Sequence, residues 1–236
     1  MAGTLTYFGT SNLIGIAGGW CVQTGSNTES WDRASGLCGG DEAAAQKYNK
    51  RVSGTLTAKN YSPSGTLAIP TVGDIMSGYH IDSVAVAYSE TDWPELTVSY
   101  HKHHIEHSAC RTYTPTAVLP AGFGVPDEIK DSDTATIFKL IGSGVGLKSL
   151  NYSLTATHVD DTAKNGTWLG GDTHNGVETL GVEFVGKAES DDMTLSEDWD
   201  VTELANGDSG TAGDTSSISM TRGVAKDEGG GGGGGD

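Results

Sequence analysis

The chain has 236 residues, of which 31 are acidic and 14 are basic, so its formal net charge at pH 7 is −17. This excess of negative charge disfavours stable binding of nucleic acid or of anionic membranes unless the few cations cluster, because like charges repel. The 35 glycines and the lack of long Leu/Ala/Glu/Lys windows indicate a mainly β chain, and an apolar content of 36% is low for a chain that buries a core alone.

The sequence shows neither an export signal nor a membrane span. Its first residues lack a basic segment followed by an apolar run, and no stretch approaches the roughly 18 apolar residues of a membrane helix. We therefore expect synthesis in the cytoplasm without export. Cys21, Cys38 and Cys110 have no regular spacing and predict no disulfide framework, although Cys21 and Cys38 could bridge in an oxidising setting.

Three regions follow one another along the chain. Residues 1–40 are rich in Gly, Ser, Thr and Asn with scattered aromatic residues, which predicts an extended N-terminal arm. Residues 41–201 form a β-rich core domain, which begins with one short helix over Glu42–Lys50 that Asp41 caps. Residues 202–236 form a polar C-terminal arm that ends in a Gly-rich tail.

The core domain contains two similar predicted hairpins, residues 81–106 and 147–188. Apolar and polar residues alternate on both arms of each hairpin, which is the period-2 pattern of a half-buried strand. The alternating apolar residues are Val84, Val86, Tyr88, Leu96, Val98 and Tyr100 in the first hairpin and Leu150, Tyr152, Leu154, Leu180, Val182 and Phe184 in the second. Their likeness indicates an internal duplication. We predict an antiparallel β-barrel or sandwich with long hairpins, one short helix and extended terminal arms.

The second hairpin is predicted to carry a long polar tip, Val159–Val177, in which Asp, Asn and Gly are dense. Connections longer than about 12–15 residues tend to be functional or disordered, so we expect this tip to contact another subunit. The predicted contact residues are Val159, Asp160, Asp161, Asn165, Trp168, Asp172, His174 and Asn175. Its carboxylates, with Glu178, could hold Ca²⁺, but they match no EF-hand spacing, and acidic loops are usually only solvated.

The densest group of candidate metal ligands is His101, His103, His104 and His107, with Cys110 following. On a strand, residues two apart share a face, so His101 and His103 could together bind Zn²⁺, Fe²⁺ or Ni²⁺. The simpler interpretation is a polar outer strand face that continues into a loop. The remaining residues match no metal spacing, and the sequence by itself predicts neither a metal site nor a cofactor.

Two short motifs have catalytic parallels. Gly207-Asp208-Ser209-Gly210 resembles the nucleophile motif of trypsin-like serine proteases, but no matching histidine box is present and Thr211 replaces a second glycine. Gly142–Gly146 could cradle a phosphate only if a helix followed, whereas the next residues alternate as a strand. We predict that the protein is not an enzyme.

The paired hairpins, the long loop, the Pro/Gly-rich connector Thr112–Asp127 and the acidity resemble tailed-bacteriophage virion proteins, especially the tail tube family. This resemblance implies a subunit whose sheets join into a continuous inner barrel, with a long loop that contacts the next ring. It also implies stacked rings with an acidic lumen through which DNA passes without specific binding, and a location in the virion.

Other functions are open at this point. The chain could be another virion component, namely a decoration, neck or spike protein, in which His101 and His103 would suit a trimeric metal-binding tip. It could be an extracellular filament or adhesin subunit if Cys21 and Cys38 are bridged. A hydrolase that uses Ser209 or the histidines is the remaining alternative.

Overall fold

The computed structural model describes most of the strands of the chain and part of its loops. The described residues are 3–9, 12–16, 19–38, 41–61, 68–89, 91–103, 111–115, 146–162, 168–185, 200–207 and 215–224. The strands are β1 (Gly3–Gly9), β2 (Trp20–Cys38), β3 (Asp41–Asn60), β4 (Ile75–Met76), β5 (Tyr79–Ser89), β6 (Asp92–His103), β7 (Gly146–Thr162), β8 (Trp168–Val185), β9 (Asp200–Gly207) and β10 (Thr215–Gly223). The described residues include no helix that could cross a lipid bilayer.

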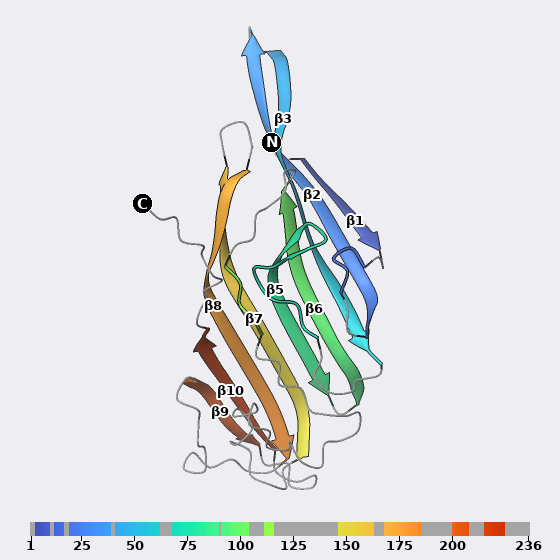
Figure 1. Ribbon diagram of the computed structural model, residues 1–236, viewed down its shortest axis with the longest axis vertical. Coiled ribbons are helices and arrows are strands. Elements are labelled where there is room, and N and C mark those ends of the chain that lie inside the picture. Colours follow the sequence, from blue (N-terminus) through green and yellow to red (C-terminus); the bar gives the residue numbers. More distant parts are fainter. Residues whose placement is uncertain are drawn as a thin grey trace, which may run out of the picture.

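These strands form one antiparallel sheet in the order β1-β2-β3-β6-β5-β7-β8-β10-β9, with the short β4 beside β5 (Figure 1). The mainly β antiparallel class is therefore confirmed. The sheet is open, with β1 and β9 at its two ends, so the predicted barrel is not confirmed. The N-terminal segment, expected as an arm, supplies β1 and β2 to this sheet, and the C-terminal segment supplies β10 and most of β9.

The short helix expected over Glu42–Lys50 is not present, because these residues belong to β3. Residues Asp41–Tyr48 pair with Asp32–Cys38 of β2. The Ala-rich segment has a high helix propensity, but an isolated helix this short is marginal in water. The ladder with β2 gives the backbone its hydrogen bonds, and tertiary pairing overrides the local preference.

Both predicted hairpins are present as β5–β6 and β7–β8, but the long loop expected over Val159–Val177 is wrong. In β7–β8 the ladder continues through this segment, with Val159 opposite Asp172 and Asp160 opposite Gly171. The register of this ladder shifts between His174 and Val177, and Asn175 has a φ of 55° there. The turn-forming residue Asn175 therefore forms a bulge within β8 and does not end the strand.

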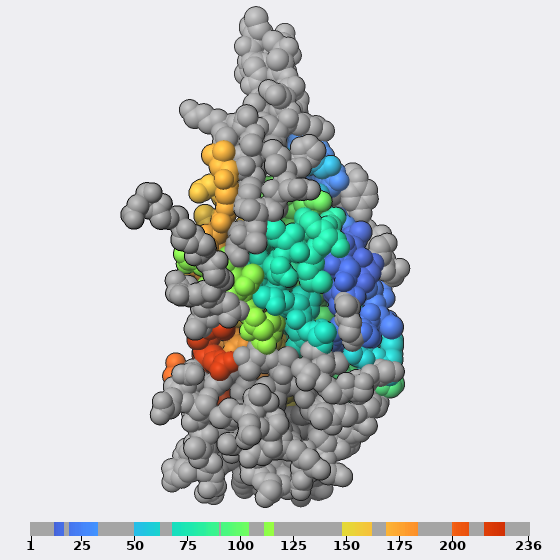
Figure 2. Space-filling view, in the orientation of Figure 1, coloured from blue at the N-terminus to red at the C-terminus, as the bar shows by residue number. Residues whose placement is uncertain are grey.

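The two faces of the sheet differ in chemistry. One face is buried and apolar, with Leu56, Val84, Val98, Leu154 and Ile218 all at most 1% exposed. Segments outside the main strands cover it, since Ile14, Ile16, Val72 and Tyr113 belong to the same core. Figure 2 shows residues 68–89 (teal) in the middle of the molecule, with residues 111–115 (light green) beside them.

The opposite face is lined with hydroxyl groups, and we call it the hydroxyl face. One row of partners crosses seven strands as Thr24, Thr57, Thr97, Ala85, Ser153, Thr179 and Thr221. Neighbouring hydroxyls in the row bond each other, at 2.5 Å between Thr24 and Thr57 and at 2.6 Å between Ser153 and Thr179. Cross-strand pairs of this kind stabilise a polar sheet face without burying it.

The β2–β3 hairpin extends beyond the rest of the sheet (Figure 1). β3 pairs with β6 only from Arg51 to Lys59, whereas its ladder with β2 continues to Asp41. We call residues 32–38 and 41–48, where β2 and β3 pair only with each other among the described strands, the β2–β3 ribbon. Cys21 and Cys38 lie near opposite ends of β2, about 55 Å apart at the usual rise per strand residue, so they cannot bridge within one chain.

Candidate metal centre

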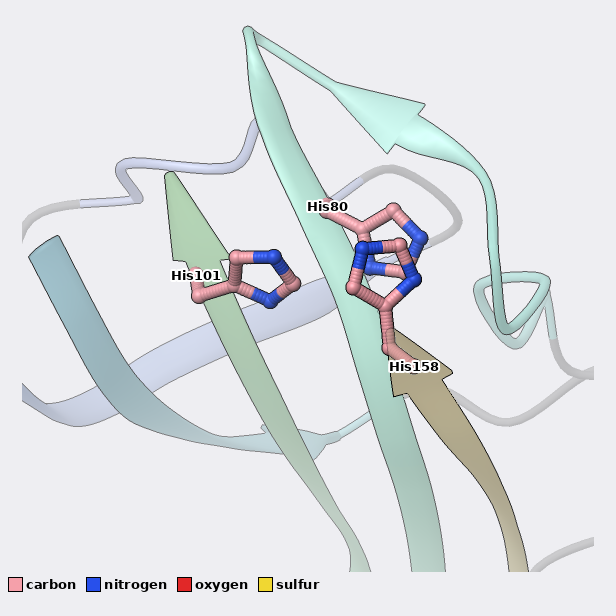
Figure 3. A group of neighbouring side chains, drawn as sticks. All are labelled: His80, His101 and His158. Atoms are coloured by element: carbon pink, nitrogen blue, oxygen red, sulfur yellow. The ribbon is translucent and has the colours of Figure 1, made fainter. Parts of the chain in front are cut away.

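Three short sequence pairs meet in space on the adjacent strands β6, β5 and β7 in the middle of the sheet. Each pair has the form His-x-His or His-x-Asp and lies on a strand, where residues two apart point to the same side. The pairs are His80–Asp82 on β5, His101–His103 on β6 and His158–Asp160 on β7. The rings of His80, His101 and His158 point toward one another from these three strands, and the centroids of His80 and His158 are 3.9 Å apart (Figure 3).

A bulge in β5 directs Asp82 into this cluster. His80 lies opposite His101 and Ile81 opposite Tyr100, but Ser83 lies opposite Ser99, so Asp82 is the extra residue. Bulges often redirect a side chain in this way. The Oδ1 atom of Asp82 accepts hydrogen bonds from His101 Nδ1 at 2.6 Å and from His80 Nδ1 at 3.2 Å.

Asp160 joins the cluster from β7. Its Oδ2 atom lies 2.6 Å from His103 Nε2 and 3.6 Å from His101 Nε2, and its Oδ1 atom lies 2.9 Å from His158 Nε2. Gly171 is opposite Asp160 in the ladder, and a Cβ there would come within 3.1 Å of Asp160 Oδ1. A glycine at this position therefore leaves the carboxylate its room.

Thr173 of β8 lies between the rings of His80 and His158. Its hydroxyl is 3.1 Å from His158 Nδ1 and 3.3 Å from His80 Nε2. A hydroxyl has one proton, so Thr173 donates to one ring and accepts from the other. Together with Asp82 and Asp160, it connects β5, β6, β7 and β8 through side chains alone.

Two members of the cluster, His80 and Asp82, have pKa values shifted from their ordinary ones. His80 is fully buried, and burial lowers its pKa below the ordinary 6.5 although the hydrogen bond to Asp82 opposes the shift. Burial alone would raise the pKa of Asp82, but hydrogen bonds from His101 and His80 outweigh it and hold this pKa below the ordinary 3.8. Asp82 is therefore a stable carboxylate anion that fixes the Nδ1 side of both rings.

A cavity of about 400 Å³ opens next to the cluster. Arg51 and Ser53 of β3 lie opposite His103 and His101 in the ladder and line it, as does Asp160. Two sets of three donors lie close enough to hold an ion, since their ligand atoms are within 4.8 Å of one another. The sets are His80, His101 and His158, and His101, His103 and Asp160. Imidazole with carboxylate suits Zn²⁺, Fe²⁺ or Ni²⁺.

The structure describes only two of the candidate metal ligands predicted from the sequence. His101 and His103 share one face of β6, while His104, His107 and Cys110 lie outside the described residues. Reasoning from the sequence missed His80, Asp82 and His158. The signal was present, because His-x-Asp occurs at both 80–82 and 158–160, in the same spacing as His101 and His103.

The residues predicted as subunit contacts have different environments. Val159, Asp161 and Asn175 are exposed, Asp172 lies 3.3 Å from Arg111, and His174 is half-buried. Asp160 instead faces the cluster. Trp168 is the first residue of β8, and Asn165 lies outside the described residues.

The described residues add no support for the other candidate sites. Glu178, one of the four carboxylates considered for Ca²⁺, is fully buried and accepts hydrogen bonds from Tyr152 and Arg222. It is therefore engaged away from Asp160 and Asp161. Ser209 and residues 142–145 lie outside the described residues.

Comparison with protein families and with curated proteins gives no relative. No protein-family model matches the chain, and no curated protein matches it. Function is therefore inferred from the fold and from the chemistry of its side chains.

Proposed function

We propose that the protein is a self-assembling structural subunit of a virion, a phage tail tube protein that forms stacked rings with an acidic lumen for DNA passage. The observation that carries the proposal is the open sheet. Its edge strand β1 has the sequence Gly-Thr-Leu-Thr-Tyr-Phe-Gly, with no charged residue and no proline. Proteins that remain monomeric commonly block such an edge with charges, proline or a cover.

A ring would use both ends of this sheet. If β1 of each subunit pairs with β9 of the next, the sheets join into a closed barrel and no edge is left exposed. Head-to-tail contacts that close in this way are the ordinary route to cyclic symmetry. The hydroxyl face would then line the interior, because the apolar face is already covered by the subunit's own segments.

The chemistry of the hydroxyl face suits the passage of DNA. Its central row is uncharged, and Lys59 next to it is paired with Asp92 at 2.6 Å and lies 4.0 Å from Glu95. The chain as a whole carries a net charge of −17. Phosphates that pass along this row would meet uncharged hydroxyls and the repulsive field of an acidic subunit.

Contacts between rings are supported by the part of β7–β8 that extends beyond its ladder with β5, which we call the distal half of β7–β8 (residues 156–162 and 168–176). Only four large apolar side chains are exposed among the described residues, and three of them are Val159, Leu169 and Val177 on this hairpin. Leu169 is 68% exposed. An apolar group on an otherwise polar hairpin favours burial against a neighbour.

Electron microscopy and sedimentation of the purified full chain test the proposal. We expect rings or tubes for the wild type, whereas a monodisperse monomer at all concentrations would refute every assembly function. The double variant Thr4→Lys, Thr6→Lys adds two charges to β1 and should prevent assembly, since charges on an edge strand oppose strand addition. Circular dichroism would verify that its sheet is intact.

A matched control distinguishes edge pairing from a general effect of charge. Asn151→Lys, Thr155→Lys adds the same two charges to exposed positions on the central strand β7. We expect this variant to assemble. Loss of assembly in both variants would show that added charge, and not the β1 edge, is responsible. A discrete trimer in place of rings would favour a decoration or spike protein.

A further inference from the structure

We propose that the protein binds one Zn²⁺ ion through His101 Nε2, His103 Nε2 and the carboxylate of Asp160, with a fourth position open to the adjoining cavity. This site lies within one chain and does not depend on assembly. Two imidazoles and one carboxylate with an open position form a common zinc ligand set.

The three ligand atoms lie within 4.8 Å of one another, and one of their separations is already close to that in a tetrahedral zinc site. Zinc bonds of about 2.0–2.1 Å place neighbouring tetrahedral ligands about 3.3 Å apart. His101 Nε2 and Asp160 Oδ2 are 3.6 Å apart, close to that separation. His103 Nε2 and Asp160 Oδ2 are 2.6 Å apart, which is a hydrogen bond. Replacing its shared proton by the metal would lengthen this pair by a shift that a side chain can make.

The residues around the three ligands hold them in the orientation that zinc requires. Asp82 accepts the Nδ1 proton of His101, which leaves Nε2 as the metal-binding nitrogen. His158 holds the second oxygen of Asp160 at 2.9 Å. Carboxylates and hydrogen bonds behind the ligands are the usual means of fixing tautomer and ring orientation in zinc sites.

The second donor set is less suitable. In His80 the Nδ1 atom faces Asp82 and the Nε2 atom faces Thr173, so binding a metal would break one of these buried hydrogen bonds. In His158 both ring nitrogens are engaged in the same way, with Thr173 and Asp160. We therefore assign His80 and His158 to positioning, and the ion to the set nearer the cavity.

Zinc at this position would join β6 to β7 beyond the point where the backbone ladders stop connecting the two hairpins. The last ladder pair between β5 and β7 is Ser83 with Thr155. Beyond this pair, the contacts that join β7–β8 to β5–β6 among the described residues are made by side chains. Arg51 also lines the adjoining cavity, and the open position would take water.

Calorimetric titration of the metal-free full chain with Zn²⁺, supported by Co²⁺ absorption spectra, tests the site. We expect one ion per chain and the visible bands of a tetrahedral Co²⁺ complex. His103→Gln and Asp160→Asn should each weaken binding at least about 100-fold, and Asp82→Asn about 10–100-fold, as a positioning residue would. His174→Ala, on the same hairpin outside the cluster, should bind as the wild type does.

Three results would overturn the proposal. The first is the absence of saturable binding in the wild type. The second is binding that survives His103→Gln but is lost in His80→Ala, which would assign the ion to the other donor set. The third is equal loss in the control His174→Ala. Thermal unfolding of each metal-free variant separates failure to fold from failure to bind, and His101→Gln repeats the test at a second ligand.

Discussion

The two longest hairpins, β2–β3 and β7–β8, show two ways in which a strand pair can continue beyond a hydrophobic core. Their arms have similar lengths, 19 and 20 residues in one and 17 and 18 in the other. Both leave the neighbouring strands part-way along. The distal half of β7–β8 is then fixed by Asp160, His158 and Thr173 to β5 and β6, whereas the β2–β3 ribbon pairs only with itself among the described residues.

The difference shows that a buried polar network can replace apolar packing where the core ends. Next to the β2–β3 ribbon the described side chains offer an ion pair between Lys50 and Glu29 at 3.0 Å, with both groups partly exposed. Such a pair contributes little. An isolated two-stranded ribbon is marginal in water, so we expect the β2–β3 ribbon to open locally at a much lower free energy than distal β7–β8.

The largest effect is expected at the base of β7–β8. Glu178 is fully buried and lies 2.5 Å from Arg222 Nε, so Arg222→Ala leaves a buried carboxylate without its cation. This should lower the free energy of unfolding by about 3–5 kcal/mol in urea denaturation. Arg111→Ala, which removes an exposed partner of Asp172, should cost less than about 1 kcal/mol. Equal losses in the two variants would contradict the assignment.

At the base of β2–β3 we expect Gly54→Ala to be the next most harmful change. A Cβ at this position would lie 2.2 Å from the carbonyl oxygen of Ser26 and 2.9 Å from the ring of Tyr100. The strands must separate to admit it, at a cost of about 1–3 kcal/mol in the same denaturation measurement. Gly223→Ala is the control, because nothing lies within 4 Å of its Cβ, and it should be close to neutral.

The substitution Thr173→Val should make distal β7–β8 behave more like the β2–β3 ribbon. It keeps the shape of the side chain but removes the hydroxyl between His80 and His158, at a cost of about 1–2 kcal/mol. Hydrogen exchange measured with EDTA present should accelerate in residues 157–174 and not in residues 41–50. Thr179→Val, which removes an exposed hydroxyl, should leave both segments unchanged. Unchanged exchange in residues 157–174 of Thr173→Val would show that the network does not hold this hairpin.

The smallest effect is expected for the ion pair between Lys59, near the end of β3, and Asp92, at the start of β6. A hydrogen bond from Lys59 lowers the pKa of Asp92 below its ordinary 3.8. The stabilisation is therefore present above pH 3.8 and is lost as the pH falls through the lowered value. In Lys59→Met an NMR titration should find the Asp92 pKa raised toward the ordinary value, with little change in stability because the pair is exposed. An unshifted titration would mean that the bond does not persist in solution.

Local alternation makes the strands of both hairpins predictable, because buried residues recur at every second position, as Val84 and Val86 do on β5 and Leu180 and Val182 do on β8. The long loop predicted over Val159–Val177 is wrong because a high density of Asp, Asn and Gly does not prevent a strand whose ladder partners leave room for these residues. In the sheet, Asp160 and Asp161 lie opposite Gly171 and Gly170, which accommodate them within a ladder. Ladder partners distant in sequence cannot be read from composition.

The candidate metal centre could be predicted only in part for a similar reason. His101 and His103 are neighbours on one strand, so their shared face follows from the sequence. Their convergence with Asp82 depends on the bulge after Ile81, and with Asp160 on the order of the strands in the sheet. Neither feature has a local signature, although the repeated His-x-Asp pairs are visible once the pattern is known.

The N-terminal and C-terminal parts of the chain form two separate groups of adjacent strands in the sheet. Residues 3–103 supply the adjacent strands β1, β2, β3, β6 and β5, and residues 146–223 supply β7, β8, β10 and β9. Among the described strands the two groups meet along one ladder, Ser83–Ser89 against Ser149–Thr155. A cut between residues 103 and 146 would sever none of these ladders, so two separately produced fragments should recombine into the intact sheet. Fragment complementation could therefore place a reporter or a chemical label on one half of the molecule alone.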